Sequence, residues 1–131
     1  MSCDTISVRK VDYYVNNPFA YIIDIREAQD YKKSHIKNAI NIPYDSFIQI
    51  LECGRNRLYN SDRFMREGDD IYFERIMSIL RERTKTFVIY CDRGAMSMVV
   101  CNKMSRMGYV TKTVVGGFNK YNGRYKEFGK L

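Results

Sequence analysis

The sequence predicts an α/β domain with a mainly parallel sheet of about five strands and helices on both faces. Short apolar runs alternate with helix-like segments along the chain. Two of the runs, at 20–25 and 86–91, are nearly continuous, which is typical of strands buried on both faces of a parallel sheet. With 131 residues the chain is long enough for a modest core, and we expect one domain over residues 1–131.

The predicted strands are short apolar runs that end at a charge, a turn residue or a proline. They lie at 5–8, 20–25, 39–42, 86–91 and 109–115. The predicted helices have helical composition or apolar residues three and four positions apart. They lie at 10–18, 26–34, 44–54, 71–83 and 96–107, with a final short helix within 116–128.

Turn residues set the ends of several elements. Asn16, Asn17 and Pro18 end the first helix, Pro43 closes the third strand, and Gly108 ends the helix at 96–107. Helices between successive strands favour right-handed crossovers in a parallel sheet.

Residues 54–70 are the least regular part of the sequence. We expect a surface loop or a flap there.

Composition excludes several classes of protein. The net charge is +7, but the basic residues are scattered among acids, so a nucleic-acid partner is not favoured. No apolar run has the length of a membrane span or a signal peptide. We therefore expect no membrane partner and a cytoplasmic protein.

The cysteines show neither a CxxC motif nor a Cys/His spacing that would hold zinc. We expect no metal and no cofactor. In a reducing compartment the cysteines should be thiols rather than disulfides. They are Cys3, Cys53, Cys91 and Cys101.

Cys91 ends the fourth predicted strand, and the polar turn "DRGAMS" leads from it into a helix. Amide groups at a helix N-terminus stabilise a thiolate placed there. Gly94 can take a backbone angle that other residues resist, Ser97 can cap the first turn, and Arg93 can reach an anion or lie in solvent. The alternative is a buried strand cysteine with no chemistry.

Three segments, in order, resemble the rhodanese (sulfurtransferase) family. They cover about Tyr21 to Tyr121 and read "YIIDIREAQDYKKSHIKNAINIPY", "VIYCDRGAMS" and "MGYVTKTVVGGFNKY". The resemblance implies a single rhodanese-like domain. It also implies that the Cys91 thiolate takes the outer sulfur of a small anionic donor such as thiosulfate as a persulfide. Cyanide, a thiol or a protein then accepts that sulfur.

The resemblance further implies that the loop after the nucleophile binds the donor. This loop comprises Asp92, Arg93, Gly94, Ala95, Met96 and Ser97. Many family members carry Arg at the position of Met96 or a basic residue at that of Asp92. The acid at Asp92 would repel a dianionic donor if it points inward, so polysulfide or a protein persulfide is a second hypothesis for the donor.

Two other functions are weighed against sulfur transfer. Phosphatase relatives use a Cys-x5-Arg loop, and the position of that Arg is Ser97 here, so phosphatase or arsenate reductase activity is not favoured. A rhodanese-like module that binds a partner through 54–70 without catalysis is the alternative from another class.

The remaining candidate residues have mainly structural interpretations. His35 stands in the family's Gly-His-Ile turn and is expected to be structural. Asp24 and Arg26 are expected to form an ion pair that braces the active-site loop. Cys101 is expected in the core and Cys3 in a frayed terminus, while Cys53 could approach Cys91 if 54–70 folds over the site.

Overall fold

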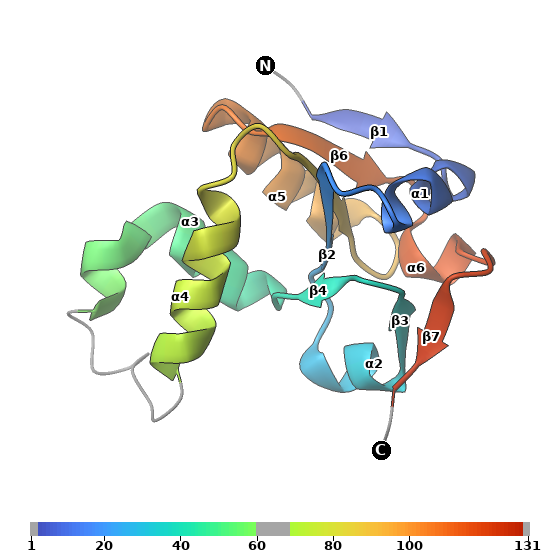
Figure 1. Ribbon diagram of the computed structural model, residues 1–131, viewed down its shortest axis with the longest axis horizontal. Helices are drawn as coiled ribbons and strands as arrows, with labels where there is room; N and C mark the ends of the chain where they lie inside the picture. Colours follow the sequence, from blue (N-terminus) through green and yellow to red (C-terminus); the bar gives the residue numbers. More distant parts are fainter. Residues whose placement is uncertain (1–2, 60–68, 130–131) are drawn as a thin grey trace.

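The computed structural model describes the backbone of residues 3–59 and 69–129, and the side chains of 3–52 and 71–129. Its main sheet has the strand order β1-β6-β5-β2-β4, with all four strand pairs parallel (Figure 1). The strands are β1 (Asp4–Ile6), β2 (Ala20–Asp24), β4 (Ile40–Asn41), β5 (Thr86–Tyr90) and β6 (Val110–Val114). The predicted five-stranded parallel sheet is confirmed.

Helices cover both faces of this sheet, as predicted. Alternate residues of β5 divide the core, because Phe87 and Ile89 belong to one buried cluster while Val88 and Tyr90 belong to another. The first cluster packs against α3 (Tyr44–Tyr59), α4 (Asp69–Leu80) and α5 (Ala95–Arg106). The second packs against α1 (Val8–Val15) and α6 (Gly117–Lys120).

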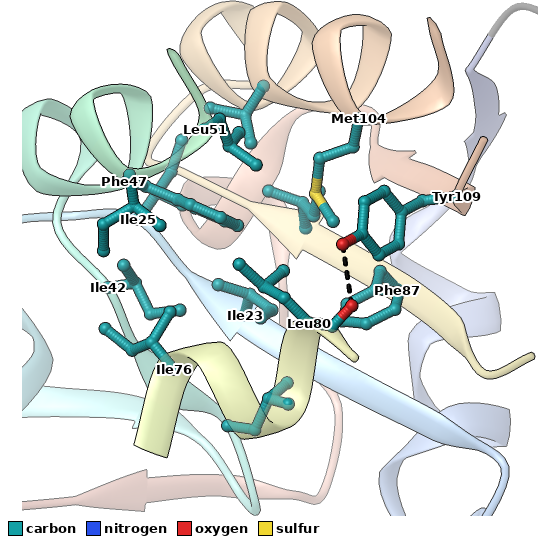
Figure 2. Close-up of a cluster of buried hydrophobic side chains, with 14 of the residues drawn as sticks. Ile23, Ile25, Ile42, Phe47, Leu51, Ile76, Leu80, Phe87, Met104 and Tyr109 are labelled. Atoms are coloured by element: carbon teal, nitrogen blue, oxygen red, sulfur yellow. Dashed lines mark hydrogen bonds between the residues drawn. The ribbon is translucent and has the colours of Figure 1, made fainter. Parts of the chain in front are cut away.

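The first cluster is the larger part of the core (Figure 2). Phe47 from α3, Ile76 from α4 and Met104 from α5 close over Ile23 and Phe87 of the central strands. Beside them, the hydroxyl of Tyr109 donates a hydrogen bond of 2.7 Å to the carbonyl of Leu80, which satisfies a buried polar pair. This packing holds α3, α4 and α5 against the central strands β2 and β5.

The final short helix predicted within 116–128 is present as α6, but the residues after it are not helical. Only α6 is helical there, and Lys126–Phe128 forms strand β7, which pairs antiparallel with β3 (Ser34–Ile36). Neither strand was predicted, because each has three residues and no apolar run. The pair lies next to α2 (Ala28–Lys33), apart from the main sheet (Figure 1).

The prediction of an irregular segment at 54–70 is also partly wrong. Helix α3 continues to Tyr59 and α4 begins at Asp69. Residues 60–68 lie outside the described residues, as does the side chain of Cys53, whose predicted approach to Cys91 is therefore not addressed.

Two cysteines are joined in the structure. Cys3 and Cys101 form a disulfide with their Cα atoms 5.5 Å apart. The prediction of thiols was wrong for this pair, because it assumed a reducing compartment, and no local pattern indicates a contact between cysteines 98 positions apart. Cys101 is buried in the core as predicted, whereas Cys3 packs against that core instead of fraying.

Among the described residues, no helix combines the length and the apolar character that crossing a membrane requires.

Candidate active site

Cys91 directly follows β5, at the carboxyl end of the central strand of the sheet. Its sulfur accepts hydrogen bonds from the backbone N–H of Gly94 at 3.1 Å and of Ser97 at 3.3 Å. Both amides belong to the start of α5, where the helix dipole is positive. Among the described side chains, Cys91 is the free cysteine. The turn therefore aims fixed positive partial charge at one sulfur atom.

Gly94 is the residue that turns the chain from strand into helix. It has φ 107° and stands immediately before the first residue of α5. A Cβ at this position would lie 3.3 Å from the amide nitrogen of Gly116 and would hold an unfavourable backbone angle. The unusual backbone angle predicted for Gly94 is confirmed, and with it the N–H of this residue points at the Cys91 sulfur.

Ser97 was predicted to cap the helix, and the structure shows that it does not. It is buried, and its hydroxyl donates to the carbonyl of Gly94 at 3.2 Å instead of accepting a free N–H. It also lies 2.7 Å from the hydroxyl of Thr113 on β6 and 3.5 Å from the Cys91 sulfur, whose S–H can donate to it. The side chain thus connects the sulfur to the neighbouring strand.

The turn is also held from its other side by α6. The amides of Phe118 and Asn119 donate to the carbonyls of Cys91 and Asp92, at 2.8 Å and 3.0 Å. Gly117 makes this approach possible, since a Cβ there would lie 2.5 Å from both carbonyl oxygens. Sequence reasoning assigned no site role to this segment, although its Gly-Gly pair was the available signal.

The predicted ion pair of Asp24 and Arg26 is present and buried. Nη2 of Arg26 lies 2.8 Å from Asp24 Oδ2 and donates to the carbonyl of Ser34 at 2.6 Å. The guanidinium lies 4.1 Å from the ring centre of Phe118. Burial lowers the pKa of Arg26, but the hydrogen bond and charge of Asp24 outweigh this effect and raise it. The pair therefore connects the end of β2 to β3 and to α6, the helix that holds the turn after Cys91.

A cavity of about 620 Å³ opens above Cys91. Four of the predicted loop residues, Asp92, Arg93, Ala95 and Met96, line it, whereas Gly94 and Ser97 are not part of the lining. The Asp92 side chain is 58% exposed and lies 4.0 Å from Nη1 of Arg26.

The rest of the lining comes from elements that the sequence analysis did not connect with Cys91. These residues are Ile25, Arg26, Glu27, Asp30, Tyr44 and Asn119. Of these, only Arg26 had been considered for the site. Strands β2 and β5 are parallel neighbours, so the segments after both strands meet at one edge of the sheet.

His35 has a structural role, as predicted. Its ring stacks on Tyr31 at 3.9 Å, and Nδ1 lies 2.8 Å from the Tyr31 carbonyl. Within the described residues, no group of three or more His, Cys, Asp or Glu side chains could hold a metal ion.

The sequence model of the rhodanese-like domain matches residues 9–124. The chain belongs to the rhodanese-like domain family. A comparison with curated protein sequences gave no match. Rhodanese-like domains occur in sulfurtransferases and also in non-catalytic and phosphatase-like proteins. Membership therefore supports the sulfurtransferase superfamily, and the chemistry of the site must indicate the reaction.

Solved structures share this fold. The reduced CoADR-RHD protein of Bacillus anthracis is 28% identical with a TM-score of 0.58, over 88% of this chain but only 16% of that protein. A rhodanese with anions from E. coli is 24% identical with a TM-score of 0.56, over 84% and 99% of the two chains. A possible tyrosine phosphatase from Rhodopseudomonas palustris is 15% identical with a TM-score of 0.62, over 91% and 79%.

Proposed function

We propose that this rhodanese-like domain is a sulfurtransferase that carries a sulfane sulfur as a persulfide on Cys91. The observation that carries the proposal is the pair of backbone amides, from Gly94 and Ser97, that point at the Cys91 sulfur at the base of an open cavity. Two N–H donors at a helix N-terminus favour an anionic sulfur over a neutral one.

In the first half-reaction, the Cys91 thiolate attacks the outer sulfur of the donor. With thiosulfate, the new bond joins the two sulfurs, the S–S bond of the donor breaks, and sulfite leaves with the bonding electrons. The product on Cys91 is a persulfide anion. Its charge lies on the terminal sulfur, beside the start of α5, where the positive end of the helix dipole favours an anion.

In the second half-reaction, an acceptor attacks the terminal sulfur of this persulfide. Cyanide leaves as thiocyanate, and a cellular or protein thiol leaves as its own persulfide. The Cys91 thiolate is released in both cases and the cycle closes. No separate general base is required once the thiol is ionised, which agrees with the structural role of His35.

Phosphoryl transfer is less well supported by the same geometry. A Cys-x5-Arg loop would place a guanidinium at position 97, where it would form a bidentate clamp on a phosphate. This chain has a buried serine there, and its hydroxyl contacts Gly94 and Thr113.

The test is the intact mass after brief incubation with excess thiosulfate and removal of the donor. We expect a gain of one sulfur atom that cyanide or a thiol removes. Cys91→Ser should show no gain, and Cys53→Ser, which keeps the nucleophile, should show the full gain. No gain with either thiosulfate or polysulfide, while Cys91 still reacts with an alkylating agent, would overturn the proposal in favour of a binding module.

A further inference from the structure

The charges around Cys91 distinguish between classes of sulfur donor. Resting on the proposed function, we propose that the site selects small hydropersulfides (R–S–SH) whose carrier group R bears an ammonium, and disfavours the thiosulfate dianion. Among the described residues, the cavity lining holds three carboxylates and two guanidinium groups. The carboxylates are Glu27, Asp30 and Asp92, and the guanidinium groups are Arg26 and Arg93.

The positive charge of Arg26 is largely neutralised by its neighbours. Its Nε and Nη2 both bond to the Asp24 carboxylate, Nη2 also donates to Ser34, and Nη1 lies 4.0 Å from Asp92. Its side chain is only 5% exposed. The hydrogen-bonded Asp24–Arg26 pair as a whole carries no positive charge, so it attracts a further anion weakly.

The carboxylates of the lining take part in fewer ion pairs than Arg26 does. Neither Glu27 nor Asp30 pairs with a cation among the residues the structure describes. Asp92 directly follows the nucleophile; it lies 4.0 Å from Nη1 of Arg26, and its side chain is 58% exposed to solvent. Of the described residues that line the cavity, Arg93 carries the other guanidinium, and it is also exposed. Although the chain has a net charge of +7, the surroundings of this sulfur are therefore locally acidic, which favours a cationic ligand over a dianion.

The cavity also fits a donor that has a carbon skeleton. Its volume of about 620 Å³ is in the range of small-molecule sites. Ile25, Tyr44 and Met96 supply apolar and aromatic surface beside the charged groups. Thiosulfate has no carbon atoms that could contact this apolar surface, whereas the methylene groups of an aminothiol persulfide can pack against it.

The transfer step balances for this class of donor. The Cys91 thiolate attacks the terminal sulfur of R–S–SH, and the S–S bond of the donor breaks. The terminal sulfur moves to Cys91 with its hydrogen, and R–S⁻ leaves with the bonding electrons and takes a proton from water. Nothing is oxidised or reduced overall, and no further reactant is needed.

The test compares three hydropersulfides that differ in the charge of the head group. They are made from cysteamine, 2-mercaptoethanol and 3-mercaptopropionate, which carry a cation, a neutral hydroxyl and an anion. Single-turnover persulfide formation on Cys91 is followed by mass spectrometry at low salt, with thiosulfate as a fourth donor. We expect the order cysteamine, mercaptoethanol, mercaptopropionate, with thiosulfate slowest.

The donors also differ in intrinsic reactivity. The same rate ratios are therefore measured on the double variant Glu27→Gln/Asp30→Asn, where that reactivity is unchanged. An exposed ion pair changes an equilibrium constant by about 1.4- to fivefold, so loss of two carboxylates should lower the cysteamine-to-mercaptopropionate rate ratio by about two- to twentyfold. Glu82→Gln is the matched control. Glu82 pairs with Lys85 before β5, at the opposite end of that strand from Cys91, and its loss should leave the ratio unchanged.

Salt provides a measurement that needs no variant. Added sodium chloride should slow the cysteamine donor and speed the mercaptopropionate donor on the wild-type chain. A rate ratio that neither salt nor the double variant changes would overturn the selectivity and leave sulfur transfer through Cys91 intact. Absence of transfer from all four donors would overturn the proposed function itself, and the selectivity with it.

Discussion

The hydroxyl of Ser97 on α5 lies 2.7 Å from the hydroxyl of Thr113 on β6, and both side chains are buried. Because Ser97 also lies 3.5 Å from the Cys91 sulfur, this pair connects the sheet to the proposed nucleophile. Sequence reasoning had no signal for Thr113, which lies 22 positions after Cys91 in an ordinary strand.

Thr113→Val should lower the free energy of unfolding by about 1 kcal/mol, since it removes one buried hydrogen bond and keeps the side-chain shape. It should also change the alkylation rate of Cys91, because Ser97 loses the contact that orients its hydroxyl. Urea denaturation and peptide mapping after iodoacetamide treatment measure the two effects. Thr111→Val is the control, as its buried hydroxyl bonds to the carbonyl of Cys101. Equal effects of both variants on Cys91 would contradict the connection.

Gly94→Ala should reduce the rate of persulfide formation at least tenfold. The alanine would hold φ 107° and place its Cβ 3.3 Å from Gly116, and relief of that strain moves an amide that now lies 3.1 Å from the sulfur. We expect a stability loss of about 1–2 kcal/mol as well.

The control is Gly108→Ala, which has a similar φ of 95° and a nearest contact of 3.5 Å to Arg83. It should cost comparable stability and leave sulfur transfer at the wild-type rate. If Gly108→Ala slows transfer as much as Gly94→Ala does, the effect is global strain and not the displaced amide.

Tyr90 gives the fold a dependence on high pH. Burial, followed by the charge of Asp24, raises the pKa of Tyr90 well above its ordinary value, and its hydroxyl accepts a hydrogen bond from the Ile36 amide at 3.1 Å. The neutral form is therefore favoured in the folded state. Its stabilising effect is complete below about pH 10, where the unfolded tyrosine ionises, and falls by about 1.4 kcal/mol per pH unit above it.

Tyr90→Phe lacks both this titration and the hydrogen bond to Ile36. At pH 7 it should be less stable than the wild type by about 1 kcal/mol. Between pH 10 and 11 the difference should shrink toward zero, because only the wild type loses stability through this group. Urea denaturation of both proteins at pH 7, 10 and 11 measures the difference, and a constant value across that range would disprove the assignment.

The Cys3–Cys101 disulfide should contribute to stability without taking part in catalysis. It joins residues 98 positions apart, and a loop of that length is stabilised by about 2–5 kcal/mol through the restricted unfolded chain. A reductant such as dithiothreitol should therefore lower the unfolding midpoint of the wild type. Cys3→Ser should start from that lower midpoint and be insensitive to reductant, and both proteins should form the persulfide once reductant is removed. Equal midpoints with and without reductant would contradict this role.

The local sequence pattern was sufficient to predict the central strand β5 and the turn that follows it. The run Phe87 to Tyr90 is apolar on both faces, so it can only be satisfied inside a sheet covered by helices, and the structure has it there. The glycine in the turn after Cys91 likewise predicted a special backbone angle, and Gly94 has one.

Elements with little pattern were missed for physical reasons. Strands β3 and β7 have three residues each, and as strands they exist only through pairing with a partner at least 90 positions away in the sequence. The hydroxyl of Ser97 was assigned to a helix cap because serine near the start of a helix often has that role. Its contact with Thr113 depends on β6 lying beside β5, which no local signal encodes.

The sequence by itself determined the fold class, the family and the position of Cys91 between a strand and a helix, because these depend on hydrophobic periodicity and on residues near one another in the chain. Only the tertiary structure decided what surrounds that sulfur. The parallel pairing of β2 with β5 brings Arg26, Glu27 and Asp30 to the cavity, and packing of α5 brings Cys101 to Cys3. Contacts between distant residues follow from how whole elements bury their apolar faces, and the local sequence does not specify that arrangement.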